Sequence, residues 1–216
     1  MQTLETSLSN FAEAFNKYNY TYGASQEGKL LHRSEAQSVN VDSRIPLSSE
    51  LKFFYETYEM VGTVYKRGHQ LDVLNIEIGG APVYLYPLDL LAARQNGFRW
   101  IGRQEPFKEN PKWNPSWVVI ADKNDDPIIV DTAKKGSPVY ASYEGGDEFP
   151  LCDSLATFFD ALAIILETVN KFDGDVIDEE TLEVKSDYVE TLEPLLEEVI
   201  GPEYTKNMFE YLSYRE

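Results

Sequence analysis

The chain has 216 residues, of which 43% are hydrophobic and 13% aromatic, which is enough for a packed core and excludes wholesale disorder. Its formal net charge of −18 disfavours nucleic acid and anionic membranes as partners, because both would repel it. The longest aliphatic run, Ala161 to Leu166, is far shorter than the roughly 20 residues that cross a bilayer. The single cysteine, Cys152, excludes an internal disulfide, so we expect a cytoplasmic protein with a buried thiol.

The first part of the chain contains two helical patterns separated by a polar segment. Apolar residues at steps of four, three and four predict an amphipathic helix from Thr3 to Tyr18. The segment from Asn19 to Arg44 is rich in Ser, Gly, Gln and Asn, which predicts a loop with room for a short strand. Pro46 then opens a second helix, which Ser48 or Ser49 could cap and which ends before Gly62.

The next stretch changes from strand to helix and then to an irregular connection. Ile76 to Ile78 and Val83 to Tyr86 read as two strands joined at Gly79-Gly80. Pro87 to Gln95 predicts a short helix, and Phe98 to Ser116 an aromatic-rich connection. Aromatic residues interleaved with basic ones could form a nucleic-acid stacking surface, but the overall charge favours packing at the core and its rim. The basic residues are Arg99, Arg103, Lys108 and Lys112.

The centre of the chain predicts an antiparallel hairpin followed by a strand and a buried helix. The apolar runs Trp117 to Ala121 and Ile128 to Val130 flank the polar segment Asp122 to Pro127. A strand from Pro138 to Ser142 follows, and the strongly apolar helix Ser154 to Asn170 must lie across the sheet. The residues expected in the core are Trp117, Val119, Ile128, Val130, Leu155, Phe158 and Leu162.

The composition changes after Lys171. Residues 173–216 contain 14 acidic and 3 basic residues, a net charge of −11. Two amphipathic helical patterns separated by Gly201-Pro202 fill most of this segment, and their apolar stripes indicate that it docks onto the rest of the protein. We therefore expect an α+β domain over residues 1–172 and an acidic helical C-terminal extension over residues 173–216, packed on that domain.

No pattern in the sequence indicates catalysis or cofactor binding. Cys152 has acidic neighbours, which oppose a reactive thiolate, and His32 and His69 lie in presumed loops without partner residues. Asp122-x-Asn124-x-Asp126 imitates the start of a calcium loop, but Pro127 and Ala133 occupy the positions that need Gly and Glu. Phosphate-binding and dinucleotide glycine motifs are missing. We expect no enzyme, with no catalytic residue, cofactor or metal site.

A family resemblance covers residues 46–166 and depends on the order and spacing of weak marks. These marks are Pro46, Leu51 and Phe53 to Tyr55 in a proline-opened helix; Leu85 to Leu90, a strand running into a short helix; the strands Trp117 to Asp122, Ile128 to Asp131 and Pro138 to Tyr140; and Ser154 to Phe159 at the start of the final helix. In this order they resemble the SUKH superfamily, the fold shared by a fungal cell-wall assembly regulator and many bacterial immunity proteins.

The resemblance implies both a fold and a function. The implied fold is α+β, with a central, mostly antiparallel sheet, helices packed around it, and no catalytic residues. Bacterial members commonly neutralise polymorphic toxins by direct binding, and many of those toxins are basic nucleases. The resemblance therefore implies a cytoplasmic immunity protein that binds a cognate toxin. The alternative is a regulatory or scaffold module with a non-toxin partner. The oligomeric state stays open.

Two acidic surfaces compete as the partner-binding site. The first is formed by the turns of the sheet, which are exposed and free to vary. Its residues are Asp122, Asp125, Asp126, Glu144, Asp147 and Glu148. The second is the C-terminal extension, with Glu179, Glu180, Glu193, Glu197 and Glu198. We favour the turns, because glutamates spaced along an amphipathic helix already have a structural reason to face water.

Overall fold

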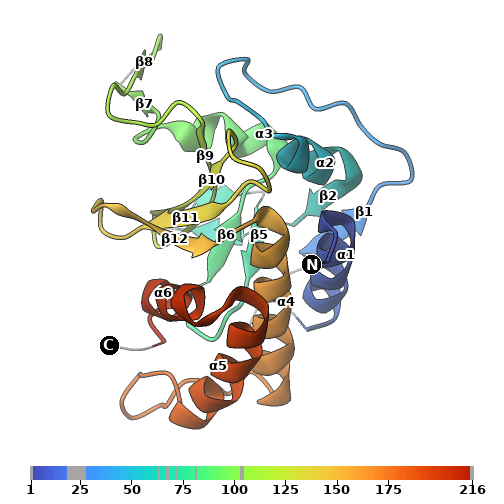
Figure 1. Cartoon of the computed structure of the whole chain (residues 1–216), viewed down its shortest axis with the longest axis vertical. Coiled ribbons are helices and arrows are strands. Elements are labelled where there is room, and N and C mark those ends of the chain that lie inside the picture. Colours follow the sequence, from blue (N-terminus) through green and yellow to red (C-terminus); the bar gives the residue numbers. More distant parts are fainter. Residues whose placement is uncertain are drawn as a thin grey trace.

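The computed structural model describes residues 2–18, 28–62, 64–66, 69–71, 73–80, 82–102 and 105–214. Helices pack around an antiparallel sheet, and a helical segment completes the C-terminal part (Figure 1). This confirms the expected α+β class, its antiparallel sheet and its C-terminal helical extension.

The elements follow one another in an order close to the expected one. In sequence they are α1 (Leu4–Tyr18), β1 (Lys29–His32), α2 (Ser49–Thr57), β2 (Tyr58–Val61), β3 (Val64–Lys66), β4 (His69–Leu71), β5 (Leu74–Ile76), β6 (Val83–Leu85), α3 (Leu88–Leu91), the 3-10 helix η1 (Ala93–Gln95), β7 (Trp100–Ile101), β8 (Lys108–Glu109), β9 (Trp117–Lys123), β10 (Asp126–Asp131), β11 (Val139–Ser142), β12 (Glu148–Cys152), α4 (Leu155–Lys171), α5 (Ser186–Ile200) and α6 (Pro202–Leu212).

The main sheet has the strand order β12-β11-β10-β9-β6-β5, and every neighbouring pair is antiparallel. The β9–β10 hairpin confirms the central prediction, but its turn contains only Asn124 and Asp125. Their φ angles of 55° and 74° are the positive values that a two-residue hairpin turn with the twist of its strands requires. The rest of the polar segment joins the strands, so that Asp122 pairs with Pro127 and Lys123 with Asp126.

A buried glutamine extends the hydrogen bonding of β9 beyond the end of its neighbour. β6 pairs with β9 only at Tyr84 and Leu85, which leaves the backbone of Val119 without a strand partner on that side. The Gln95 side chain fills the gap: its Nε2 donates to the Val119 carbonyl at 2.9 Å, and its Oε1 accepts from the Val119 N–H at 3.0 Å. Because Gln95 is fully buried, these bonds satisfy groups that water cannot reach.

Helix α4 is the central buried element of the fold. Ser154 caps it by accepting a hydrogen bond from the Thr157 N–H, and ten of its residues are buried. In Figure 1 it crosses the sheet next to α1, and α5 packs on it as well. The Phe159 ring lies 5.1 Å from that of Phe11 in α1 and 5.0 Å from that of Phe54 in α2, so one side chain joins three helices.

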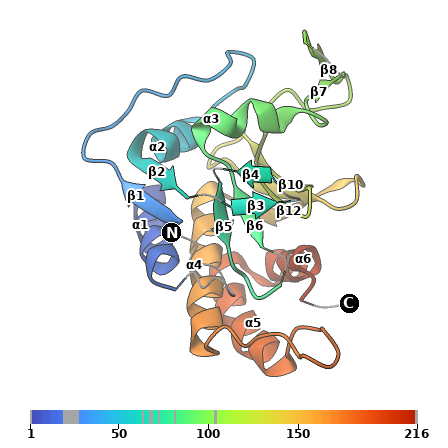
Figure 2. The same ribbon diagram turned by 180° about the vertical axis from the view of Figure 1, so that it is seen from behind.

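A smaller cluster covers the opposite face of the sheet, which is turned toward the viewer in Figure 2. Val119 belongs to this cluster together with Val73, Tyr86 and Ile129. Trp117 packs against it half-buried, with its ring 6.1 Å from that of Tyr140. The sequence had predicted Trp117 in the core. This prediction is wrong, because Trp117 packs only half-buried against the smaller cluster. The other residues expected in the core are buried, and all but Val119 lie in the main cluster.

Part of the N-terminal loop is ordered by side-chain hydrogen bonds to backbone. Asn16 in α1 accepts from the Leu30 N–H and donates to the Leu30 carbonyl, at 2.9 and 2.8 Å. This places β1, which pairs with β2. Residues 19–27 lie outside the part of the chain that the structure describes.

Two residues of the 98–116 connection, Arg99 and Trp100, are buried, whereas Lys108 and Lys112 are exposed. Arg99 is buried, donates to the Pro115 carbonyl at 2.9 Å and pairs with Glu109. Trp100 is also buried, with the Arg44 guanidinium 4.4 Å from its ring centre. Arg103 lies outside the described residues. The packing role expected for this connection is therefore observed at Arg99 and Trp100.

Phe158 provides a direct test of the α4 packing. Its side chain is 1% exposed, so Phe158→Ala should reduce the free energy of unfolding by about 3–5 kcal/mol through lost burial and a residual cavity. Urea unfolding measures this loss, with Glu167→Ala on the exposed side of α4 as a control that should change little. A loss below about 1 kcal/mol would contradict the described packing.

Candidate protein-binding site

The turn end of the sheet, defined here as residues 122–126 and 143–148, brings together two turns that are distant in sequence. β9 and β11 both flank β10, so the β9–β10 and β11–β12 turns lie at the same end of the sheet. The Glu144 N–H donates to Asp126 Oδ1 at 2.8 Å, which ties one turn to the other. The structure thus gathers the acidic residues that the sequence had proposed as partner-binding.

Asp122 does not have the exposed position that the sequence suggested. It is only 3% exposed and lies within β9 instead of in the turn. Its Oδ2 accepts a hydrogen bond from the buried Tyr86 hydroxyl, and its Oδ1 accepts from the Asp125 N–H at 2.9 Å. Burial, together with the adjacent Asp122 charge, raises the pKa of Tyr86. Asp122 therefore stabilises the β9–β10 turn through its hydrogen bond with the Asp125 N–H. Its buried carboxylate is not exposed to a partner.

The remaining five carboxylates differ in how freely they can meet a partner. Asp125, Glu144, Asp147 and Glu148 are exposed, whereas Asp126 is half-buried and holds the second turn. Asp125 and Glu144 have positive φ angles of 74° and 49°, so their backbone conformation limits which residues can replace them. Asp147 and Glu148 are the two whose charge can be changed with the least effect on the fold.

The C-terminal extension docks beside this turn end. The Tyr211 hydroxyl in α6 donates to the Asp126 carbonyl at 2.8 Å, and Lys123 Nζ donates to Ser213 Oγ at 3.0 Å. The Tyr214 hydroxyl donates to the Ile78 carbonyl, next to the β5–β6 connection. Figures 1 and 2 both show α6 close to β12, with which it is in contact. The end of the C-terminal extension therefore adjoins the turn end, whereas Glu198 of the second acidic surface lines a different pocket with residues of α1 and α4.

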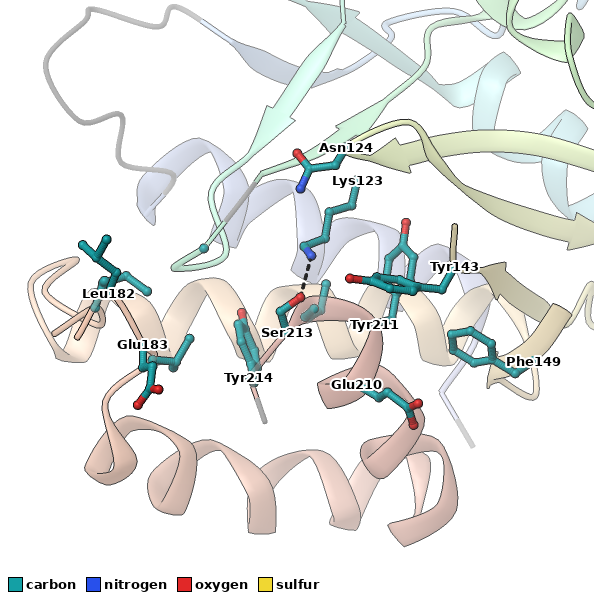
Figure 3. Close-up of a pocket in the computed structure, with 14 residues that line it drawn as sticks. Lys123, Asn124, Tyr143, Phe149, Leu182, Glu183, Glu210, Tyr211, Ser213 and Tyr214 are labelled. Atoms are coloured by element: carbon teal, nitrogen blue, oxygen red, sulfur yellow. Dashed lines mark hydrogen bonds between the residues drawn. The ribbon is translucent and has the colours of Figure 1, made fainter. Parts of the chain in front are cut away.

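A cavity of about 720 Å³, here called the turn-side groove, separates the turns from the extension. Figure 3 shows Leu182 and Glu183 at one end and Phe149 at the other, with Lys123 and Ser213 between them. Its residues come from the turn end, β12, the β5–β6 connection, the 177–184 loop and the end of α6. They are Gly80, Lys123, Asn124, Tyr143, Phe149, Ile177, Leu182, Glu183, Val184, Glu210, Tyr211, Leu212, Ser213 and Tyr214.

The loop that carries Leu182 holds an apolar side chain in solvent. Asp178 Oδ1 accepts from the N–H groups of Glu180 and Thr181, both at 2.9 Å, and the Asp178 carbonyl accepts from the Leu182 N–H at 2.8 Å. Leu182 has a φ of 62°, an unfavourable value for leucine, and is 79% exposed. Residues with strained backbone conformations concentrate at functional sites. Tyr143, 45% exposed, adds a second such side chain across the groove.

Lys123 is the positive charge within this acidic surface. The residue is only 5% exposed, and its ammonium lies under α6. Burial lowers the pKa of Lys123, and the nearby Asp126 charge offsets part of that effect.

The described residues give little support for other kinds of site. No three or more His, Cys, Asp or Glu side chains among them are grouped so that they could hold a metal ion. No helix in the described ranges is long and apolar enough to cross a membrane. Cys152 is fully buried, as expected, and burial raises the pKa of its thiol well above the usual range, with Asp153 adding to the effect.

Comparison of the chain with protein-family models, curated proteins and solved structures gave no significant match.

Several residues of the groove could not be identified from the sequence. Tyr211 belongs to the apolar stripe of the last helix, which had indicated docking but not its target. Lys123 falls within the polar segment Asp122 to Pro127 that the sequence predicts as a turn, because the length of β9 depends on its pairing with β10. Leu182 has no sequence signal at all: its exposure results from the turn that Asp178 closes.

The Lys123 amine predicts a pH dependence of stability. Because its pKa in the folded state is below the ordinary value of 10.5, the folded state releases this proton first as the pH rises. The unfolded state then holds more protons, so the contribution of Lys123 to the free energy of unfolding increases with pH. The stability of the wild type relative to Lys123→Met should therefore rise between about pH 7 and about pH 10.

Urea unfolding at several pH values measures this difference, with Lys52→Met as the reference for the loss of one positive charge at an exposed position. A difference between wild type and Lys123→Met that stays constant or falls over this range would contradict the buried environment of the amine.

Proposed function

We propose that this protein is a non-enzymatic immunity protein that binds and neutralises a cognate, basic protein toxin at the turn end and the turn-side groove. The observation that carries the proposal is the combination of exposed carboxylates from two turns with exposed apolar side chains along one groove. Glu148 and Asp147 supply charge, while Leu182 and Tyr143 supply apolar area. Protein interfaces commonly have such an apolar centre within a polar rim.

The charge of the chain supports a basic partner. With a formal net charge of −18, the protein attracts a positively charged toxin over long range and accelerates the encounter. Nucleases carry basic surfaces that bind phosphates, and an acidic surface can occupy such a site in place of the substrate. Tyr143 and Leu182 would then provide short-range affinity, because aromatic and apolar anchors contribute most of the binding energy at interfaces.

The resemblance to the SUKH superfamily provides the second line of support. It implies an α+β fold without catalytic residues and a toxin-binding role for bacterial members. A regulatory or scaffold module would have the same fold. The groove favours the toxin-binding role because its exposed residues lie on turns and loops, which can diversify together with a partner without changing the core.

The first experiment is co-expression with the toxin encoded beside the gene of this protein. We expect the toxin alone to arrest growth and co-expression to restore it, with both proteins in one complex on gel filtration. Growth arrest that persists, without a complex, would contradict the proposal. Recovery of only a non-toxin protein in a pull-down from the native cells would instead identify the regulatory module.

Charge reversal then locates the binding surface. Asp147→Lys with Glu148→Lys should weaken toxin binding by about tenfold at low salt, mainly through slower association, and the effect should shrink as salt rises. Glu197→Lys with Glu198→Lys changes the net charge equally on the exposed face of α5 and should weaken binding much less. The opposite ranking of the two variants would move the site to the C-terminal helices.

Truncation before residue 173 cannot replace these variants. Tyr188, Leu192 and Leu196 of α5 are fully buried, and α5 packs on α4. Removing them would expose the main core, so lost binding would report unfolding instead of the location of the site.

A further inference from the structure

The loop that carries Leu182, here called the leucine loop and defined as residues 176–185, is closed by backbone hydrogen bonds. At its base the Lys185 N–H donates to the Val176 carbonyl at 2.9 Å, and the Asp178 N–H donates to the Glu183 carbonyl at 2.8 Å. Val176 is fully buried in the main core, which anchors the loop to the rest of the protein. These contacts give the loop a defined conformation in the free protein.

Leu182 occupies a position in this loop that favours other residue types. Its φ of 62° lies in the left-handed region, where a bulky side chain is an outlier and Asn is more common. The side chain is also 79% exposed, so little of its apolar surface is buried within the protein. The leucine therefore favours neither the backbone conformation of the loop nor the packing of the core. A residue that opposes local preferences in this way, without a gain in packing, is typical of a functional position.

The surroundings of Leu182 on the loop are negatively charged. Three exposed glutamates lie within three residues of it in the sequence. They are Glu179, Glu180 and Glu183. The nearest basic residue in the sequence, Lys185, is paired with Asp175 at 2.6 Å. An apolar side chain with negatively charged neighbours is complementary to an apolar pocket that has a positively charged rim.

We propose that Leu182 inserts into an apolar pocket on the surface of the basic toxin, and that the three glutamates pair with lysine or arginine residues at the rim of that pocket. The inference rests on the proposed function and deepens it, because it names the feature of the toxin that this site recognises. The toxin pocket would remove the leucine side chain from water, so that an aliphatic anchor is buried at the centre of a polar rim.

Other partners fit the leucine loop less well. A nucleic acid or an anionic membrane would be repelled by the three glutamates and by the net charge of −18. A second copy of this chain carries the same net charge and would be repelled in the same way. A small ligand requires a cavity that encloses it, and a side chain that is 79% exposed provides little enclosure. A basic protein satisfies both the apolar and the electrostatic condition.

The test measures the affinity of the purified protein for the toxin encoded beside its gene, by isothermal titration calorimetry. Leu182→Asn removes the apolar side chain and should weaken binding at least about tenfold, the effect of leaving one leucine unburied. The loss should be the same at low and high salt, because ions do not screen apolar burial. Leu182→Met keeps an apolar side chain of similar volume and should bind within about threefold of the wild type.

Two control variants separate the anchor from general changes of the surface. Val199→Asn introduces the same residue at another exposed apolar position, on α5, and should leave the affinity unchanged. Glu179→Gln with Glu180→Gln removes two charges from the leucine loop and should weaken binding about threefold or more at low salt, with a smaller effect at high salt.

Thermal unfolding of the protein alone separates binding from folding. Leu182→Asn should raise the Tm by about 1–4 °C, because Asn adopts a positive φ more readily than Leu. A lower Tm would mean that Leu182 is needed for the fold, and would overturn the proposal.

The binding outcomes distinguish this inference from the proposed function. If the wild type does not bind the toxin, the proposed function falls and the leucine anchor falls with it. If the wild type binds and Leu182→Asn binds equally well, the proposed function stands and the leucine anchor falls. A loss that disappears at high salt, or a Leu182→Met variant as weak as Leu182→Asn, would also overturn the apolar anchor.

Discussion

The turn-side groove depends on the docking of the C-terminal extension through buried tyrosine hydroxyls. Tyr211 bonds to the Asp126 carbonyl at the hairpin turn, and Tyr214 bonds to the Ile78 carbonyl at the β5–β6 connection. A buried hydroxyl that loses its acceptor costs about 1–3 kcal/mol, so these bonds strongly favour a single docked position. Burial raises the pKa of both tyrosines well above the usual range, which keeps the hydroxyls protonated as donors. The turn-side groove is the space left beside these contacts.

The end of β9 shows how one strand gives two charged residues different roles. Neighbouring side chains on a strand point to opposite faces. Asp122 therefore reaches Tyr86 on one face, while Lys123 reaches Ser213 and α6 on the other. Neither is available as an exposed charge, so the surface that a partner meets is formed by the turns around them. In the described structure the Lys123 amine therefore has Ser213 as its hydrogen-bond partner and no direct ion pair with the turn carboxylates.

Local patterns predicted the elements of the fold better than their contacts. Some local preferences agree with the tertiary packing, and these were predicted correctly. They are the helical spacing of Leu4, Leu8 and Phe11, the capping serine before α4 and the apolar runs of the hairpin. The sequence analysis missed β12 because Pro150 interrupts its alternating pattern. Only part of the candidate site followed from the sequence. The acidic turns were visible in the sequence, but the burial of Asp122, the exposure of Leu182 and the position of α6 depend on pairings between distant segments, which composition and periodicity do not encode.

Hydrogen–deuterium exchange of the protein with and without its toxin partner tests the central claim most directly, because it maps the bound surface without altering any residue. A partner at the turn-side groove should slow exchange in residues 143–148 and 178–184, both loops that carry exposed side chains in the free protein. Exchange in α1, on the other side of α4, should stay unchanged (Figure 1). Protection confined to α1 or to the outer face of α5, with both loops unaffected, would contradict the assignment of the site.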